Sequence, residues 1–157
     1  MTWTIRTAGA ADAPACFAVY VDAIRGGTGG KYTRRQALAW APEGDAGDWL
    51  AAHLECGATW IAVSERRAEG FLNVTPLGHL ALFFIRPEAR ASGLAAALHD
   101  RLMAWAQARA LPRLTTNASH LARSFLEKHG WRVLGSESVE RGGVALKRWK
   151  MEWCRMR

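Results

Sequence analysis

Residues 86–98, RPEARASGLAAAL, follow directly on the apolar run HLALFFI of residues 79–85. The run predicts a buried strand, and the alanine-rich sequence after Gly93 predicts a helix. Free N–H groups and the positive end of the helix dipole favour an anion at such a helix start. Gly93 lets the main chain approach a ligand closely, and Arg90 adds a guanidinium suited to phosphate. The stretch therefore predicts a cradle for a diphosphate, although an ordinary capped helix after a strand has the same pattern.

The small residues in this stretch agree with the cradle. Ser92 has a hydroxyl that is expected to cap the helix or to donate to a phosphate. Residues 95–97 are all alanine, so no bulky side chain screens the helix end. The sequence contains neither Gly-x-x-x-x-Gly-Lys-Ser/Thr nor Gly-x-Gly-x-x-Gly. This absence excludes a P-loop and a dinucleotide-binding turn.

The 157 residues suit one domain, spanning residues 1–157, because no repeat or low-complexity linker interrupts them. Half of the residues are apolar, which argues against a disordered or fibrous class. The first residues, MTWTIRTAGAADAP, lack a basic-then-apolar leader, and no apolar run approaches 18 residues. The sequence therefore predicts a cytoplasmic protein with no membrane partner.

The three cysteines, Cys16, Cys56 and Cys154, are an odd number at wide spacings. This pattern fits neither a disulfide framework nor a zinc site, and no metal is expected. Cys16 and Cys56 are predicted to be buried thiols on helices.

The net charge of +7 is unevenly distributed along the chain. Residues 86–157 hold fourteen Lys and Arg against six Asp and Glu, so the basic excess lies in the second half. Apart from a merely solvated surface, this excess suggests a polyanionic partner, either a phosphate-bearing cofactor or nucleic acid. Aromatic residues do not alternate with the central arginines as they would in a nucleic-acid platform, so a cofactor is favoured.

Hydrophobic periodicity divides the chain into alternating strands and helices. Strands are predicted at residues 3–7, 59–65, 70–75, 79–85, 113–116, 131–140 and 144–153, and helices at 11–25, 33–41, 47–56, 93–110 and 119–129. The last strand changes phase between Leu146 and Trp149, which predicts a bulge near Lys147 and Arg148. The result is a mixed α/β sheet with helices on both faces.

Two motifs resemble those of the GNAT superfamily of N-acetyltransferases. Arg90-x-x-Gly93-x-Ala95 is similar to its coenzyme A signature, Arg/Gln-x-x-Gly-x-Gly/Ala. Residues 117–131, NASHLARSFLEKHGW, resemble the second motif of the superfamily. Both motifs occur in the order that the family has.

Further similarity extends the resemblance over nearly the whole chain. Tyr32-Thr33, Trp40-Ala41-Pro42 and residues 139–144 resemble a bacterial branch labelled YafP-like. The family implies an α/β (α+β) fold with a mixed, mostly antiparallel twisted sheet of six to seven strands.

The resemblance also implies acetyl-CoA as cofactor, bound in a wedge between the fourth and fifth strands. Main-chain groups of Phe83, Phe84 and Ile85 would pair with the pantetheine arm. The diphosphate would be held by Arg90, Ala91, Ser92, Gly93, Leu94 and Ala95. Asn117, Phe125 and Lys128 would line the far side of the wedge.

The catalytic residues of the family are not all matched. Leu126 stands where the family has a tyrosine acid, and Ala81 stands where an acidic residue is common. Strand alternation puts His79 on the face of Ala81, so His79 is the candidate base, although it also fits a surface histidine at a strand end. Ser119 is a candidate donor to the sulfur or the carbonyl, and it equally fits a plain helix N-cap.

The acceptor is expected to bind between residues 25 and 50, where Tyr32 and Trp40 are candidate contacts. Trp40 and Trp49 also fit core positions. The implied reaction is direct transfer of an acetyl group to an amine of a small molecule or protein. The alternatives are a degenerate acyl-CoA-binding protein, motivated by Ala81 and Leu126, and a basic nucleic-acid-binding module. Nucleic acid is not an expected partner, and a homodimer is compatible with the sequence.

Overall fold

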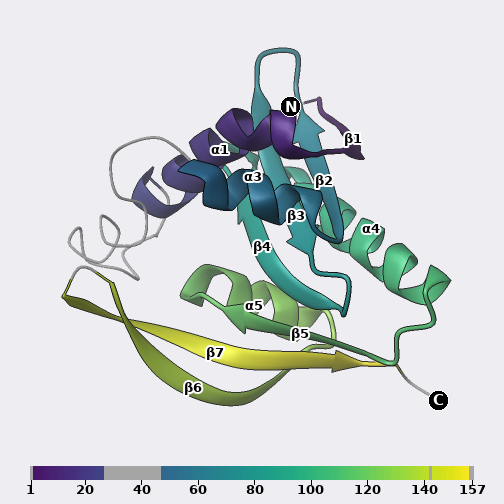
Figure 1. The fold of residues 1–157 in the computed structure, drawn as a ribbon, viewed down its shortest axis with the longest axis vertical. Coiled ribbons are helices and arrows are strands. Elements are labelled where there is room, and N and C mark those ends of the chain that lie inside the picture. The colour runs from purple at the N-terminus through teal and green to yellow at the C-terminus, as the bar shows by residue number, and fades with distance from the viewer. Residues whose placement is uncertain (1, 27–46, 142, 156–157) are drawn as a thin grey trace.

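The computed structural model describes residues 2–26, 47–141 and 143–155. The predicted helix beginning at Thr33 and the candidate acceptor contacts Tyr32 and Trp40 lie outside this part of the chain. The strands form one sheet in the order β1-β2-β3-β4-β5-β7-β6 (Figure 1). They are β1 (Thr4–Thr7), β2 (Ala58–Val63), β3 (Ala68–Val74), β4 (His79–Ile85), β5 (Arg113–Ala118), β6 (Arg132–Arg141) and β7 (Val144–Cys154).

Helices cover both faces of this sheet. They are α1 (Ala13–Gly26), α3 (Gly47–Glu55), α4 (Leu94–Ala108) and α5 (His120–Lys128), with short 3₁₀ turns at Ala10–Asp12 and Pro87–Ser92. In Figure 1, α1 and α3 lie in front of the sheet, whereas α4 and α5 lie behind it. Neighbouring strands are antiparallel except β4 and β5, which are parallel. This arrangement confirms the predicted mixed α/β class.

Two apolar cores lie on the two faces. Behind the sheet, Leu94, Leu98 and Leu102 of α4 are fully buried against strand residues such as Leu72. Their spacing of four residues puts them on one helix face, as the sequence predicts. In front, α1 and α3 bury a second cluster against β2, β3 and β4, including Cys16, Val19, Leu50, Ile61 and Phe71.

A bulge interrupts β4 at Ala81. Leu80 pairs with Val74 and Leu82 pairs with Asn73, so Ala81 is the extra residue. Leu80 consequently packs in the rear core, and Leu82 packs in the front core. The regular alternation that was used to place His79 beside Ala81 therefore does not hold along β4.

The bulge predicted near Lys147 and Arg148 is wrong. Both residues pair regularly with β6, and the irregularity lies in β6 itself, between Val133 and Gly135. The extra residue is on β6 because this strand is at the sheet edge, whereas β7 is held on both sides there. The phase change in β7 coincides with Trp149, where pairing with β5 begins.

The cysteines differ in burial. Cys16 is fully buried, and burial raises its thiol pKa to about 12, so this thiol is inert. Cys56 is exposed, which corrects its predicted burial on a helix. The physical reason is that α3 ends one residue earlier, at Glu55, and Gly57 turns the chain in a left-handed conformation.

The described residues contain neither a membrane-spanning helix nor a cluster suited to a metal ion. None of the helices is long and apolar enough to cross a membrane. No group of three or more His, Cys, Asp or Glu residues is placed to hold a metal ion.

Candidate functional site

The gap between β4 and β5 is the central feature of the site. These strands pair only at His79–Thr115 and Leu80–Thr116, and they then diverge (Figure 1). The N–H of Arg86 donates to the carbonyl of Glu69 on β3. Because antiparallel pairing alternates, the main chain of Phe84 also faces β3, whereas that of Phe83 and Ile85 faces the gap. The diverging strands thus leave polar main-chain groups directed into an open wedge.

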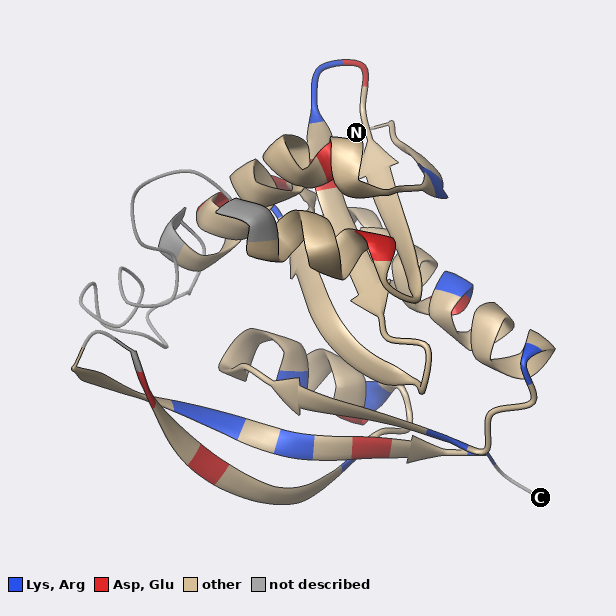
Figure 2. Cartoon of the chain, viewed as in Figure 1, with Lys and Arg blue, Asp and Glu red and all other residues tan. Residues whose placement is uncertain are grey.

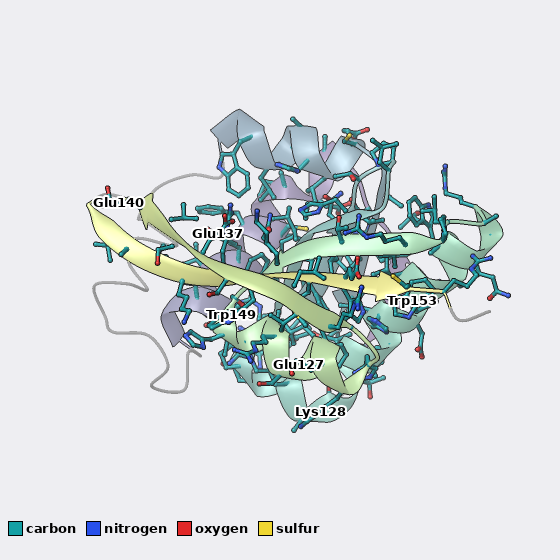
Figure 3. All side chains as sticks on the ribbon, turned by 90° about the horizontal axis from the view of Figure 1, so that it is seen from below. Glu127, Lys128, Glu137, Glu140, Trp149 and Trp153 are labelled. Atoms are coloured by element: carbon teal, nitrogen blue, oxygen red, sulfur yellow. The ribbon has the colours of Figure 1, made fainter. Side chains whose placement is uncertain are left out.

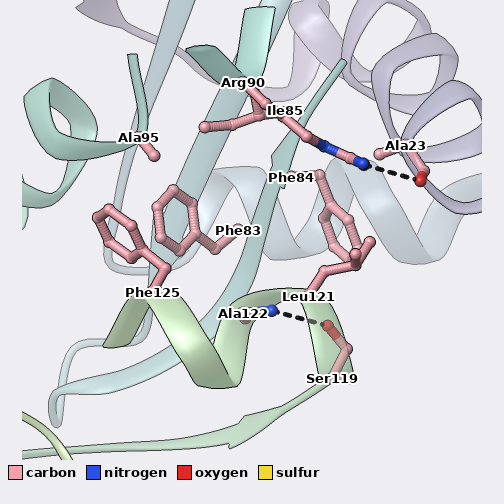
Figure 4. A pocket seen from close by; sticks show the side chains of 10 residues that line it. All are labelled: Ala23, Phe83, Phe84, Ile85, Arg90, Ala95, Ser119, Leu121, Ala122 and Phe125. Atoms are coloured by element: carbon pink, nitrogen blue, oxygen red, sulfur yellow. Dashed lines mark hydrogen bonds between the residues drawn. The ribbon is translucent and has the colours of Figure 1, made fainter. Parts of the chain in front are cut away.

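A pocket of about 230 Å³ occupies this wedge (Figure 4). Its wall is mostly apolar, and the rings of Phe83 and Phe125 meet edge to face with centroids 5.6 Å apart. It is lined by Ala23, Phe83, Phe84, Ile85, Arg90, Ala95, Ser119, Leu121, Ala122 and Phe125. Residues of β4, α1, α4 and α5 therefore meet around one apolar slot.

Arg90 is the cation of this pocket. Its guanidinium donates to the carbonyl of Ala23 at 3.0 Å, which joins the turn before α4 to α1 (Figure 4). Burial lowers the pKa of Arg90, but a guanidinium stays charged at any physiological pH. The pocket consequently has one positive group at the end where α4 begins.

The turn before α4 is open at Gly93. Gly93 has a φ of +83°, and a Cβ placed there would meet no heavy atom within 4 Å. The left-handed conformation favours glycine, and the free space lets a ligand approach the main chain. The turn is therefore open on the side where a Cβ of Gly93 would lie.

Ser92 is not the N-cap of α4. Gly93 holds that position, and no side chain caps the helix. The hydroxyl of Ser92 donates to the carbonyl of Ala89 at 2.5 Å and accepts from the indole N–H of Trp3 at 3.2 Å. Its single proton is thus engaged within the 3₁₀ turn, and the main chain is left as the donor for an anion.

A second pocket of about 290 Å³ opens on the front face, beside α1 and α3. It shares Phe83, Phe84, Ser119 and Ala122 with the first pocket, so the two meet inside the wedge. Its other lining residues are Tyr20, Trp49, His53, Thr75, His79, Leu80, Ala81, Leu82, Thr116, Asn117, Ala118, Leu126 and Arg148. Trp49 is 45% exposed, which corrects its expected place in the core.

His79 lies in the second pocket at the apex of the wedge. Its Nδ1 is 2.9 Å from Oγ1 of Thr115. Burial, and then the nearby charge of Arg148, lower the pKa of His79 below its usual value of 6.5. The imidazole is therefore neutral at neutral pH and has the form of a proton acceptor.

Ser119 lies where both pockets meet. Its Oγ accepts from the N–H of Ala122 at 3.3 Å, so it is the N-cap of α5 (Figure 4). Accepting this bond leaves the hydroxyl proton available for a ligand. The side chain therefore satisfies the helix end and still presents a donor to the wedge.

Ala81 and Leu126 also line the second pocket, and neither side chain titrates. Leu126 is completely buried. Among the described residues that line this pocket, His79 and His53 provide the imidazole groups.

The remaining candidates are dispersed. Phe125 lines the first pocket, and Asn117 lines the second. Lys128 is exposed at the end of α5 and lines neither pocket, and it extends outward from the helix in Figure 3. Tyr20 and Arg148 were missed as site residues, because no local sequence signal brings α1 and β7 to one pocket.

Comparisons with known proteins agree on one family. The family model described as "Acetyltransferase (GNAT) domain" matches residues 47–153. An uncharacterized N-acetyltransferase, YafP of Escherichia coli K12, is 26% identical over 127 residues, which cover 81% of this chain and 79% of that protein.

Solved structures of the same kind superpose closely. A GCN5-related N-acetyltransferase from Rhodopseudomonas palustris has a TM-score of 0.87 at 27% identity and covers 99% of this chain and 97% of its own. The PaiA N-acetyltransferase of Thermoplasma acidophilum, solved with coenzyme A, has a TM-score of 0.75 at 16% identity, over 99% and 100% of the two chains. The latter likeness is one of fold.

Proposed function

This chain belongs to the GNAT acetyltransferase family, and we propose that it transfers an acetyl group from acetyl-CoA directly to an amine. The observation that carries the proposal is the meeting of two pockets at Phe83, Phe84, Ser119 and Ala122. One pocket has a cationic end and an open glycine turn, as a nucleotide thioester needs. The other gives an acceptor access to the same point from the opposite side. Both substrates would thus be held together, so a covalent enzyme intermediate is unnecessary.

The first pocket would hold the cofactor. Main-chain groups of Phe83 and Ile85, which face the gap, would bind the pantetheine arm, and Phe84, whose main chain faces β3, would line the pocket. Amides of Arg90, Ala91, Ser92, Gly93, Leu94 and Ala95 would bind the diphosphate. When bound, acetyl-CoA supplies the thioester carbonyl that the amine attacks. Phe125 would pack against the arm, and Asn117 would lie at the acceptor side of the wedge.

Residues of this chain would then perform three tasks at the reacting atoms. His79 would take the proton of the incoming ammonium, because its neutral imidazole lies in the acceptor pocket. A main-chain N–H of Phe83 or Ile85 would donate to the carbonyl oxygen as charge develops there. Ser119 would donate a hydrogen bond from its hydroxyl to the departing sulfur and so stabilise the thiolate as it forms, a contact that Leu126 is unable to make.

A second candidate is a degenerate member that binds acyl-CoA without efficient turnover. The observation that favours it is the apolar character of Ala81 and Leu126 in the acceptor pocket. A thiol-release assay over a panel of amines, together with thermal unfolding with and without coenzyme A, separates the candidates. Thiol release that depends on an amine supports the transferase. Stabilisation by coenzyme A without any thiol release supports the degenerate form. The absence of both stabilisation and thiol release contradicts both candidates.

Location and assembly complete the proposal. We place the protein in the cytoplasm, acting on an amine of a small molecule or a protein, and a homodimer is compatible with this function. Cell fractionation tests the location, and light scattering of the purified protein tests the assembly.

A further inference from the structure

We propose that the acceptor is a small aromatic amine that also carries a carboxylate, and that Arg148 binds this carboxylate. The inference rests on the proposed acetyl transfer and names the class of substrate for the second pocket. Four observations lead to it: the charges that line the pocket, the free nitrogens of Arg148, the exposed aromatic wall, and the small volume.

The lining of the second pocket has a one-sided charge. Arg148 is its permanently charged residue, His53 and His79 accompany it, and no Asp or Glu contributes to the wall among the described residues. A polyamine, or a lysine within a basic peptide, would bring additional ammonium groups that need carboxylate partners. The positively charged wall would instead repel additional ammonium groups, and it would attract an anion.

The positive charge of Arg148 is only partly compensated. Its Nε donates to Oε1 of Glu137 at 2.5 Å, and Nζ of Lys150 lies 3.8 Å from Oε2 of the same carboxylate. One carboxylate thus faces two cations, which leaves a net charge of +1. Figure 2 shows that Lys and Arg positions on β7 lie beside Asp or Glu positions on β6, on a part of the sheet that no described helix covers in front.

The terminal nitrogens of Arg148 are available for a ligand. The described residues provide a hydrogen-bond partner for Nε alone. Arg148 lines both the second pocket and an adjoining hollow on the open face of β5, β7 and β6. Two parallel N–H donors at a pocket mouth match the two oxygens of a carboxylate.

The opposite wall of this pocket is aromatic. Tyr20 meets Trp49 and Phe84 edge to face, with ring centroids 5.9 Å and 4.9 Å apart. Trp49 also meets His53, and it is 45% exposed although tryptophan is usually covered. Phe84 belongs to both pockets, so this wall leads into the wedge. An aromatic body on this wall would direct its amine toward His79 while its carboxylate reached Arg148.

The volume limits the size of the acceptor. About 290 Å³ lies at the lower end of the range of small-molecule pockets. A single ring with an amine and a carboxylate fits this space, whereas a polycationic chain is disfavoured by the positive charge of the wall.

The test compares matched amines that differ by a carboxylate. The pairs are phenylalanine with 2-phenylethylamine and 4-(aminomethyl)benzoate with benzylamine, and spermidine serves as the polycation. For wild type we expect kcat/KM to be at least tenfold higher for one or both of the carboxylate-bearing amines than for its partner. Arg148→Met should reduce this preference to near unity, and Arg148→Lys should restore part of it.

Two control variants separate binding from folding. Arg132→Met removes another arginine that pairs with a carboxylate, Glu152, but lines neither pocket, so it should leave the preference unchanged. Glu137→Gln frees the guanidinium and should retain or increase the preference. Thermal unfolding of each variant establishes that it is folded.

The outcomes are separable from those of the proposed function. Equal or better turnover of both neutral partners, or of spermidine, overturns the inference while leaving acetyl transfer intact. If no amine releases thiol, acetyl transfer fails, and calorimetric titration of the same amines into protein saturated with coenzyme A decides the inference. Binding of a carboxylate-bearing amine that Arg148→Met weakens at least tenfold supports it, and binding without that dependence, or no binding, overturns it.

Discussion

His79 and Thr115 lie side by side at the apex of the wedge, with Nδ1 of the imidazole 2.9 Å from Oγ1 of the hydroxyl. They form the first of the two residue pairs that join β4 to β5. In the tautomer that carries the proton on Nδ1, this N–H donates a hydrogen bond to the hydroxyl oxygen of Thr115. The lone pair on Nε2 is then available to a substrate. This contact therefore marks the start of the strand divergence and orients the ring of the candidate base.

We expect His79→Ala to lower kcat at least a hundredfold and to leave the affinity for acetyl-CoA nearly unchanged, because the residue lies in the acceptor pocket. Steady-state rates and calorimetric titration with coenzyme A measure the two effects. Thr115→Val is the companion variant, since it removes the partner of Nδ1 but keeps the imidazole. A His79→Ala variant that loses cofactor affinity as well would place the residue elsewhere in the reaction.

The pH dependence of the reaction offers a test of the same residue. Burial and the charge of Arg148 lower the pKa of His79, so its protonated form accumulates only below pH 6.5. Because only the neutral form accepts a proton, kcat/KM should fall as pH decreases through this lowered pKa. Arg148→Met should move the midpoint of this decrease toward pH 6.5, because it removes a positive charge that disfavours protonation of His79. If the same decrease in kcat/KM at low pH persists in His79→Ala, His79 is not the group that causes it and has no place in the mechanism.

Local patterns in the sequence correctly predict the parts of the fold that depend on near neighbours. The four-residue spacing of Leu94, Leu98 and Leu102 is sufficient to place α4, because each residue is buried through one helix face. The β4 run likewise predicts its strand, but not the bulge at Ala81. Because the residues after His79 in this strand are all apolar, each of them is suited to the core on either face of the sheet. The sequence therefore does not indicate where the alternation of side chains between the two faces is interrupted.

The site depends on contacts that are distant in sequence. Arg148 reaches the acceptor pocket because β7 inserts between β5 and β6. The residues next to it in the sequence predict only an ordinary exposed strand. Ser92 has the sequence position of a cap, but Trp3, 89 residues away, and Ala89 occupy its hydroxyl. Family motifs predict the main-chain cradle, whereas the contacts of the side chains follow from tertiary partners.

The cradle is tested at Gly93. Gly93→Glu should abolish measurable binding of coenzyme A, because a carboxylate would occupy the open space intended for the diphosphate. Any side chain at a φ of +83° also strains the backbone by about 1–2 kcal/mol. Gly93→Ala measures this strain alone and should remain a binder.

A matched control for charge exists at Gly143. It has a φ of +76° and equally open surroundings, but it lies in the β6–β7 turn. Gly143→Glu should show the same loss of stability and full affinity for coenzyme A. Retained affinity in Gly93→Glu, measured by calorimetry, would contradict the placement of the diphosphate.

Ser119 combines two roles that substitution can separate. Ser119→Ala removes the cap of α5, at a cost of about 1 kcal/mol, and also the candidate hydrogen-bond donor to the sulfur. Ser119→Asp keeps a cap acceptor but has no hydroxyl. We expect Ser119→Asp to keep the stability of wild type in urea unfolding, and both variants to lose at least tenfold in kcat. Ser119→Thr should recover both properties. Full activity in Ser119→Ala would leave the residue only its role as a cap.

The stability of the fold should depend on pH through His99. His99 is buried in the rear core, its Nε2 accepts from the indole N–H of Trp131 at 3.0 Å, and burial with the nearby charge of His129 lowers its pKa to about 4. The unfolded chain binds this proton near pH 6.5 and the folded chain does not. Between these two values the unfolded state therefore holds more protons, and stability falls as pH decreases. The full effect is roughly 3 kcal/mol, and it levels off below pH 4.

Urea unfolding of wild type and His99→Leu at pH 7.5, 6 and 5 checks this expectation. The variant should be less stable at pH 7.5, because the indole of Trp131 loses its acceptor. It should also lose less stability than wild type as pH decreases, since its leucine takes up no proton. Glu152 and Asp12 have lowered pKa values through their arginine partners, so they destabilise the fold at more acidic pH in both proteins and cancel in the comparison. Parallel pH curves for the two proteins would show that His99 takes up its proton equally in the folded and unfolded states.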